Sequence, residues 1–378
     1  MDRIPFNRPF ITGRELDYIR EAIGQGRLSG DGSFTTRCHG WLERRIGCAK
    51  ALLTHSGTAA LEMAALLADI QPGDEIILPS FTFSSTANAF VLRGGVPVFV
   101  DIRPDTLNID ETLIETAITP RTRAIVVVHY AGVGCAMDVI VDIAKRRGLL
   151  VIEDAAHALL AEFKGRPLGS FGHLAALSFH ETKNLISGEG GALLINDSRL
   201  IERAEILREK GTNRTQFFRG EVAKYSWVDI GSSYLPSEIL AAFLWAQFEA
   251  AETITDRRLD IWSRYHVAFA EPERRGVLRR PVVPMECRPN GHMYYLLMPD
   301  LEARTGFLRG LQRQSIHAVF HYVPLHSSPA GQKYGRSHGS LFQTDSTSDR
   351  LVRLPLWVAM TAEDIERVIA AVRQLVAT

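Results

Sequence analysis

A single lysine in a polar loop is the first residue of this chain that could do covalent chemistry. Lys183 follows an apolar run that ends at Phe179, and it precedes three closely spaced glycines at positions 188, 190 and 191. Such glycines let the backbone approach a flat ligand closely. A lysine removed from water and placed near a cation has a lowered pKa, as amine nucleophiles and proton shuttles require. A loop lysine is ordinarily only a solvated charge, so its interpretation depends on the residues that accompany it.

An acidic residue at the end of another apolar run is the second such feature. Asp154 closes the sequence Val151-Ile152-Glu153-Asp154, and Lys183 follows it by 29 positions (183 − 154). In open α/β sheets the carboxyl ends of the strands face the ligand crevice. A carboxylate there can pair with a protonated pyridine nitrogen, which is the charge that makes pyridoxal phosphate an electron sink. The alternative is that Asp154 merely caps a helix.

A helix start with glycine and hydroxyl residues is the third feature. Ser56-Gly57-Thr58 follows the apolar run 51–54 and opens a helical pattern. Free backbone N–H groups and the positive end of the helix would bind a phosphate there, although the same residues also form an ordinary N-cap. Taken together, the amine, the carboxylate and the phosphate site predict a pyridoxal-phosphate enzyme in which Lys183 holds the cofactor as a Schiff base.

Short apolar runs alternating with helical patterns must position these residues. Runs that are apolar on both faces indicate central strands of a largely parallel sheet covered by helices, which is an α/β fold. Helices are predicted over 58–69 and 137–147, and a long helical stretch over about 237–265. The six predicted strands are Glu75–Pro79, Val96–Asp101, Ala124–His129, Leu149–Asp154, Ala175–Phe179 and Ala192–Asn196.

Length and composition set the frame for this fold. The 378 residues favour a large domain over 1–250 and a smaller C-terminal α/β domain over 251–378. Lys+Arg and Asp+Glu both count 43, which argues against a nucleic-acid binder. The four scattered cysteines suggest neither disulfides nor a metal site. Because no apolar run could span a bilayer and the N-terminus is no signal peptide, we expect a cytoplasmic protein without membrane contact.

Several motifs together resemble one family along nearly the whole chain. They are IPFNRPFITGREL, LSGDGSFTTRCHGWLE, HSGTAALEMA, PSFTFSSTANA, EDAAHA, SFHETKN with its glycine turn, and HYVPLH. The chain resembles the DegT/DnrJ/EryC1/StrS sugar aminotransferases. That resemblance implies the fold-type-I architecture of pyridoxal-phosphate transferases, like that of aspartate aminotransferase. It also implies a homodimer with its active sites at the interface.

The resemblance also assigns roles by position. Lys183 would hold the cofactor and move the proton, and Asp154 would bind the pyridine nitrogen. The remaining cofactor contacts would come from Gly57, Thr58 and Ser178 at the phosphate, Phe83 over the ring face, His157 beside the ring, and Ser233. Many relatives carry asparagine at the position of Ser233, where it reaches the phosphate of the partner subunit. A serine has a shorter reach, which puts that contact in question.

The segment Glu209–Glu249 points to a substrate. It resembles family members that make dTDP-4-amino-4,6-dideoxygalactose for enterobacterial common antigen, a cell-surface polysaccharide. The resemblance implies that L-glutamate gives its amino group, leaves as 2-oxoglutarate, and is followed by a dTDP-linked 4-keto-6-deoxy sugar. Candidate contacts to that sugar nucleotide are His321, Tyr322 and His326 beside a proline turn, and Arg214, Phe218 and Arg219, which could reach the neighbouring subunit.

Other functions stay open at this stage. A relative with other stereochemistry would make the glucose epimer or act at C3, and some family members were proposed to be non-catalytic regulators. A pyridoxal-phosphate sugar dehydratase is disfavoured, because those relatives replace the lysine with histidine. A plain nucleotide-binding α/β protein is disfavoured by the lack of G-x-x-x-x-G-K-[ST] and G-x-G-x-x-G motifs.

Overall fold

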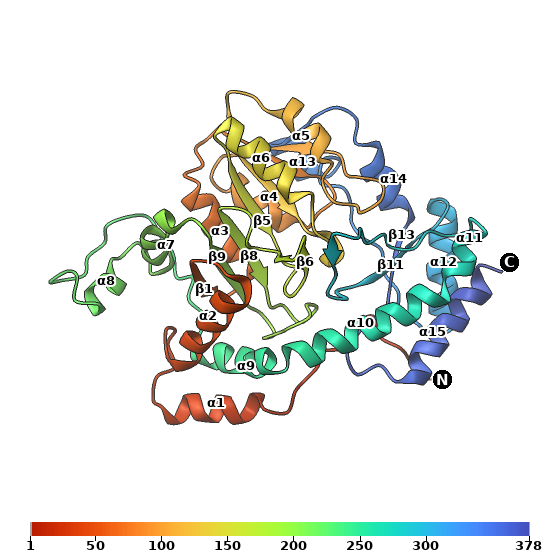
Figure 1. Cartoon of the computed structure of the whole chain (residues 1–378), viewed down its shortest axis with the longest axis horizontal. Helices are drawn as coiled ribbons and strands as arrows, with labels where there is room; N and C mark the ends of the chain where they lie inside the picture. Colours follow the sequence, from red (N-terminus) through yellow and green to blue (C-terminus); the bar gives the residue numbers. More distant parts are fainter. Residues whose placement is uncertain (1, 378) are drawn as a thin grey trace.

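An eight-stranded sheet forms the centre of the molecule (Figure 1). We describe residues 2–377 from a computed structural model of the chain. In spatial order the strands are β1 (Lys50–Thr54), β9 (Gly191–Ile195), β8 (Leu174–Ser178), β5 (Leu150–Asp154), β4 (Thr122–Val128), β2 (Glu75–Pro79), β3 (Val96–Val100) and β12 (Arg336–Ser337). All six strands predicted from apolar runs are present within two residues of their expected bounds.

The sheet is mostly parallel, as predicted. The neighbouring pairs from β8 through β5, β4, β2 and β3 to β12 are all parallel. The exception is β9, which runs antiparallel to both of its neighbours, β1 and β8. A central strand is buried on both faces whichever way it runs, so its apolar residues do not reveal its direction. As a result β1 runs in the same direction as β8, and the two strands end at the same edge of the sheet.

Helices cover both faces of this sheet. One face packs against α1 (Glu15–Gly24), α2 (Ser33–Ile46), α5 (Glu111–Ala117), α6 (Met137–Arg147) and α9 (Glu238–Glu249). The other face packs against α3 (Gly57–Leu67), α4 (Ser84–Val91) and α7 (Ile201–Arg208). Successive residues of β4 alternate between the two cores: Ile125 and Val127 point to the first, Ala124 and Val126 to the second. This alternation is the two-residue period of a strand, here with apolar side chains on both sides.

The C-terminal part of the chain builds a separate hydrophobic core. Its elements are α10 (Ala251–Ala268), α11 (Ala270–Arg274), β11 (Tyr294–Leu297), α12 (Leu301–Arg313), α13 (Pro329–Tyr334), α14 (Phe342–Arg350), β13 (Leu351–Leu354) and α15 (Ala362–Leu375). Tyr265, Tyr294 and Val368 lie in this core, and so does Ile4 from the N-terminal segment. Conversely, β12 from the C-terminal part of the chain pairs with β3 at the edge of the central sheet. The division into domains at residue 250 stays a prediction.

Two further features complete the fold. The short strands β6 (Glu162–Phe163), β7 (Arg166–Pro167) and β10 (Cys287–Arg288) form a small sheet of their own. The helix α8 (Arg214–Phe218) and its flanking loops project away from the rest of the chain (Figure 1, left). No helix within residues 2–377 is long and apolar enough to cross a membrane.

Candidate active site

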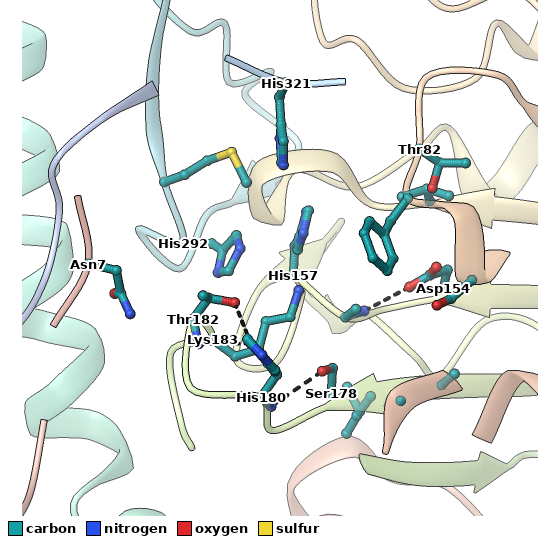
Figure 2. A pocket seen from close by; sticks show the side chains of 18 of the residues that line it. Asn7, Thr82, Asp154, His157, Ser178, His180, Thr182, Lys183, His292 and His321 are labelled. Atoms are coloured by element: carbon teal, nitrogen blue, oxygen red, sulfur yellow. Dashed lines mark hydrogen bonds between the residues drawn. The ribbon is translucent and has the colours of Figure 1, made fainter. Parts of the chain in front are cut away.

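A cavity of about 480 Å³ lies where several strands end. Asp154 at the end of β5 and Ser178 at the end of β8 both line it. Residues that follow β1 and β2, among them Gly57 and Phe83, line it as well. Lys183 lies in the same cavity (Figure 2), so the structure brings together the amine, the carboxylate and the helix start singled out in the sequence.

The loop that carries Lys183 is folded back on itself by backbone hydrogen bonds. The amide of Phe179 donates to the carbonyl of Gly190 and the amide of Ser187 donates to the carbonyl of Phe179, both over 2.8 Å. The amide of Lys183 donates to the carbonyl of His180 over 2.8 Å. Gly190 has φ 157°, and a Cβ atom there would lie 2.4 Å from the hydroxyl of Ser187. The glycine turn therefore closes the loop tightly and fixes the position of the lysine.

The surroundings of Lys183 make its amine a weaker base than that of an ordinary lysine. Burial lowers the pKa of Lys183 to about 8, because removal from water disfavours the ammonium form. The carboxylate of Asp154 opposes this shift in pKa, and the guanidinium of Arg353 reinforces it. About a tenth of the amine is therefore uncharged at pH 7, far more than for an ordinary lysine, and can act as a nucleophile or accept a proton.

Asp154 is held by hydroxyl and backbone groups. The hydroxyl of Thr86 donates to Oδ2 of Asp154 over 2.7 Å, and Thr86 is also paired with Thr82 over 2.8 Å. The amide of Ala156 donates to Oδ1 over 3.2 Å. The side chain of Asp154 is buried yet borders the cavity, so the carboxylate has a fixed orientation toward whatever fills that space.

The start of α3 forms one end of the cavity. Ser56 is the N-cap, and its hydroxyl accepts from the amide of Ala59 over 3.0 Å. The other first-turn amides have no partner within the helix and remain available to an anion. A Cβ atom on Gly57 would lie 2.9 Å from Cβ of Ser178, so only glycine lets this turn approach the end of β8 so closely. Thr58 pairs with Ser85 over 2.8 Å, which adds hydroxyl groups at the same place.

His157 and Phe83 also line this cavity. His157 is buried, and its Nδ1 atom has no hydrogen-bond partner among the described residues. Burial, together with Lys183 and Arg353, holds the pKa of His157 well below its usual range, so the ring is neutral. Phe83 lies at the N-terminus of α4 with its side chain 62% exposed, available to cover a ligand.

These residues fit pyridoxal phosphate. The start of α3 offers amides and hydroxyls of the kind that bind a phosphate. Asp154 offers a fixed carboxylate for a pyridinium nitrogen, and the unpartnered Nδ1 of His157 offers a polar contact beside the ring. Lys183 offers the amine. The donor set of the cavity thus supplies a partner for each polar end of the cofactor.

The predicted sugar-nucleotide contacts are divided by the structure. His321 and Tyr322 line the cavity, and Nδ1 of His321 pairs with the hydroxyl of Tyr130 over 3.1 Å. His326 lies outside it, held by Ser80 over 2.8 Å and by an ion pair to α14. A second hollow away from Lys183 is lined by the remaining candidates, Arg214, Phe218, Arg219 and Ser233. Within one chain these four do not meet the cofactor site.

Several residues of the cavity were not foreseen from the sequence. The hydroxyl-rich run after β2 was a usable signal for Thr82, which lines the cavity, and for Thr86, which binds Asp154, because it follows a strand end. His292, Arg258 and Arg353 also line the cavity, but each comes from the C-terminal part of the chain and has no motif around it. Only long-range packing brings them to the ends of the sheet.

Comparison with known proteins agrees with this geometry. A sequence model described as the DegT/DnrJ/EryC1/StrS aminotransferase family matches residues 9–373. The spore coat polysaccharide biosynthesis protein SpsC of Bacillus subtilis is 34% identical over 382 residues, covering 99% of this chain and 97% of SpsC. The family resemblance expected from the sequence motifs is therefore confirmed.

Solved structures match over the full chain. The aminotransferase TlmJ from Streptoalloteichus hindustanus has a TM-score of 0.91 at 30% identity and covers 99% of both chains. The putative sugar aminotransferase Spr1654 from Streptococcus pneumoniae, in its PLP form, has a TM-score of 0.91 at 26% identity, covering 100% of this chain and 99% of the other. The predicted fold class, a fold-type-I transferase with a mostly parallel central sheet, is confirmed by these matches.

Proposed function

Since this chain belongs to the DegT/DnrJ/EryC1/StrS aminotransferase family, we propose that it moves an amino group from L-glutamate to a nucleotide-linked keto sugar. The acceptor is dTDP-4-dehydro-6-deoxy-D-glucose, aminated at C4, and the products are dTDP-4-amino-4,6-dideoxy-D-galactose and 2-oxoglutarate. The observation that carries the aminotransferase activity is the meeting of Lys183, Asp154 and the start of α3 in one cavity. The similarity of Glu209–Glu249 to enzymes of this specificity supports the choice of sugar.

The cofactor is pyridoxal phosphate, which supplies a carbonyl carbon to carry the amino group and a ring that withdraws electrons from it. Gly57, Thr58 and Ser178 would hold its phosphate. Asp154 would keep the ring nitrogen protonated, because a buried carboxylate stabilises a nearby cation. His157 would offer its free Nδ1 to the cofactor, and Phe83 would pack against it.

Lys183 moves the proton in both halves of the reaction. Once the amino donor is bound, the free amine of Lys183 would take a proton from the donor's α-carbon. A base with a pKa of about 8 is matched to this task, because an ordinary lysine would be almost fully protonated at neutral pH. Lys183 returns a proton to the sugar carbon in the second half. Because donor and acceptor use the same site in turn, ping-pong kinetics follow.

Arg353 receives a carboxylate of the amino donor. Its side chain borders the cavity, its Nε is buried without a hydrogen-bond partner, and it forms no ion pair with a described carboxylate. The guanidinium contacts the ring of Phe6 at 4.7 Å and the carbonyl of Phe320 at 3.3 Å. A half-buried cation without an anionic partner is costly, and glutamate brings two carboxylates.

The sugar nucleotide lies between His321 and Tyr322 of one subunit and the α8 segment of a second. The homodimer is supported by the apolar side chains that this projecting segment exposes, including Phe218 at 69% and Trp227 at 79% (Figure 1). Arg214, Arg219 and Ser233 accompany them, and together they would complete the neighbour's cavity. His326 supports this binding region indirectly, through its hydrogen bond to Ser80.

The test is a panel of acceptors offered with L-glutamate to the holoenzyme. Nucleotide-linked 3-keto and 4-keto sugars are compared, and NMR determines where and on which face the amine is installed. We expect the C4 amine of the galacto configuration. Amination at C3, or formation of the glucose epimer, would correct the substrate while keeping the aminotransferase. No amination of any sugar, with 2-oxoglutarate unformed, would support a non-catalytic role instead.

A further inference from the structure

His292 is a buried ring in the cavity wall that the reaction described above does not use. It precedes β11, and its ring stacks on that of His157 with centroids 4.2 Å apart and planes at 20°. Figure 2 shows His292, His157 and His321 coming from separate segments around the space near Lys183. Three imidazoles thus form one side of this cavity, which we call the histidine wall.

The hydrogen bonds around Asn184 fix which nitrogen of His292 carries the proton. The Nδ2 of Asn184 donates to the carbonyl of Asn290 over 2.9 Å, so its Oδ1 faces Nδ1 of His292, also at 2.9 Å. An amide oxygen only accepts, and Nδ1 of His292 must therefore donate. Burial, reinforced by His157 and Lys183, holds the pKa of His292 well below its usual range. A neutral imidazole protonated at Nδ1 has a lone pair at Nε2.

The backbone around His292 holds the ring in place. The Nδ2 of Asn290 donates to the carbonyls of His157 over 2.8 Å and Leu159 over 2.9 Å. Oδ1 of Asn290 accepts from the amide of His292 over 3.0 Å. On the other side, Arg258 donates to the carbonyl of His292 over 2.6 Å. The amide, the carbonyl and Nδ1 of His292 all have hydrogen-bond partners, so the direction of Nε2 is fixed before a ligand binds.

Nε2 is the ring nitrogen of His292 that has no hydrogen-bond partner among the described residues. His292 lines the cavity. Its neighbours in the histidine wall, His157 and His321, have pKa values lowered in the same way and are uncharged. Among the charged residues that line the cavity, Lys183, Asp154 and Arg353 are assigned to the cofactor and the amino donor, while Arg258 donates to the backbone carbonyls of Gly291 and His292. A neutral acceptor among aromatic rings suits a hydroxyl group.

Building on the proposed function, we propose that Nε2 of His292 accepts a hydrogen bond from a hydroxyl group of the sugar in the nucleotide-linked substrate. The histidine wall then distinguishes the sugar from the nucleotide, because only the sugar reaches this side of the cavity. Asn184, next to Lys183, acts as a positioning residue that keeps Nδ1 of His292 protonated and Nε2 free. The binding of the sugar is thereby coupled to the loop that carries the lysine.

Calorimetric binding to the holoenzyme tests this assignment with two unreactive probes. dTDP-glucose carries a sugar without a keto group, and dTDP lacks the sugar. In His292→Phe, which keeps a stacked ring but has no Nε2, we expect the Kd of dTDP-glucose to rise about tenfold, the size of one neutral hydrogen bond. The Kd of dTDP should not change, and neither should the cofactor's absorbance spectrum.

Two further substitutions separate the hydrogen bond from a general loss of structure. His292→Asn keeps a donor toward Asn184 without a group at Nε2, and should weaken dTDP-glucose as much as the phenylalanine. His292→Gln places a carbonyl oxygen near Nε2 and should recover most of the affinity. His317→Phe, at an exposed histidine of the same region, is the control and should match wild type.

Equal losses for both probes, or an unchanged Kd of dTDP-glucose in His292→Phe and His292→Asn, would overturn the role of His292. Failure of the proposed dTDP specificity looks different, because wild type itself would then bind neither dTDP probe, whatever residue stands at position 292. If His292→Phe or His292→Asn has lost the cofactor's absorbance spectrum, His292→Gln is compared with wild type in its place. If His292→Gln with an intact spectrum binds dTDP-glucose no better than His292→Asn, the assignment is wrong.

Discussion

The hydroxyl of Thr86 donates a 2.7 Å hydrogen bond to Oδ2 of Asp154, and so fixes the carboxylate that we propose as the partner of the cofactor's ring nitrogen. The two residues come from different elements: Thr86 lies in α4 after β2, and Asp154 ends β5. β2 and β5 are separated in the sheet by β4 alone. The parallel sheet thus brings a carboxylate and its orienting hydroxyl to the same edge.

Removal of this hydroxyl should weaken cofactor binding. Thr86→Val keeps the shape of the side chain but leaves one oxygen of a buried carboxylate without its partner. Hydrogen bonds to charged groups contribute about 1.5–3 kcal/mol, so we expect the Kd of pyridoxal phosphate to rise about tenfold to a hundredfold. Fluorescence titration of the apoprotein measures it. Thr116→Val, at an exposed threonine, serves as the control, and equal Kd values in the two variants would contradict the role of Thr86.

The pKa of Lys183 should respond to its two charged neighbours in opposite directions. In the apoprotein, the rate at which an amine reagent modifies Lys183 should rise with pH through a midpoint of about 8, because only the uncharged amine reacts. Arg353→Gln removes a cation, favours the ammonium and moves the midpoint up. Asp154→Asn removes an anion and moves it down. Peptide mass spectrometry follows the reaction, and shifts of the same sign in both variants would refute the electrostatic account.

Loss of the Arg353 guanidinium should weaken the binding of the amino donor but not of the keto sugar. In Arg353→Gln we expect the apparent Kd of L-glutamate in the first half-reaction to rise about a hundredfold, since a buried charge-assisted pair is lost. Arg353→Lys should recover part of the affinity. In the second half-reaction the apparent Kd of the keto sugar should stay unchanged. Arg304→Gln, in the same region, is the control; equal effects on both half-reactions would place Arg353 elsewhere in the mechanism.

A mixing experiment tests whether the α8 segment serves the neighbouring subunit. Lys183→Ala and the double variant Arg214→Ala, Phe218→Ala should each be inactive. When they are mixed and allowed to exchange subunits, one site in each mixed dimer combines an intact lysine with an intact segment. Random pairing then restores about a quarter of the wild-type activity. Light scattering should give a mass of twice 42.0 kDa. If the segment serves its own chain, the mixture stays inactive.

The sequence revealed most of the sheet and one side of the site. Buried strands such as Glu75–Pro79 and the helix Met137–Arg147 are continuous in sequence, and their bounds were predicted to the residue. Asp154 and Lys183 were singled out for the same reason, because Asp154 ends such a strand and Lys183 lies in the loop after another. The direction of β9 was not recoverable, since both of its faces are apolar in either orientation.

The other side of the site depends on contacts between distant parts of the chain. His292 and Arg353 reach the cavity because β11 pairs with β13 and because Asn290 binds the carbonyl of His157, 133 residues away. No local pattern marks these residues. Ser233 was expected at a cofactor phosphate, and Arg214, Phe218 and Arg219 at the sugar nucleotide, yet within one chain all four line a different hollow. The role we propose for them depends on a second subunit, whose contacts a single chain does not contain.

Reduction with borohydride tests the central claim, that Lys183 carries the cofactor, most directly. The holoenzyme is reduced, digested, and its peptides are mapped by mass spectrometry. We predict one peptide that gains the mass of the reduced cofactor on Lys183, and a colourless, unlabelled Lys183→Ala variant that still folds. Cofactor attached to another lysine, or a wild-type protein that takes up no cofactor at all, would contradict the account.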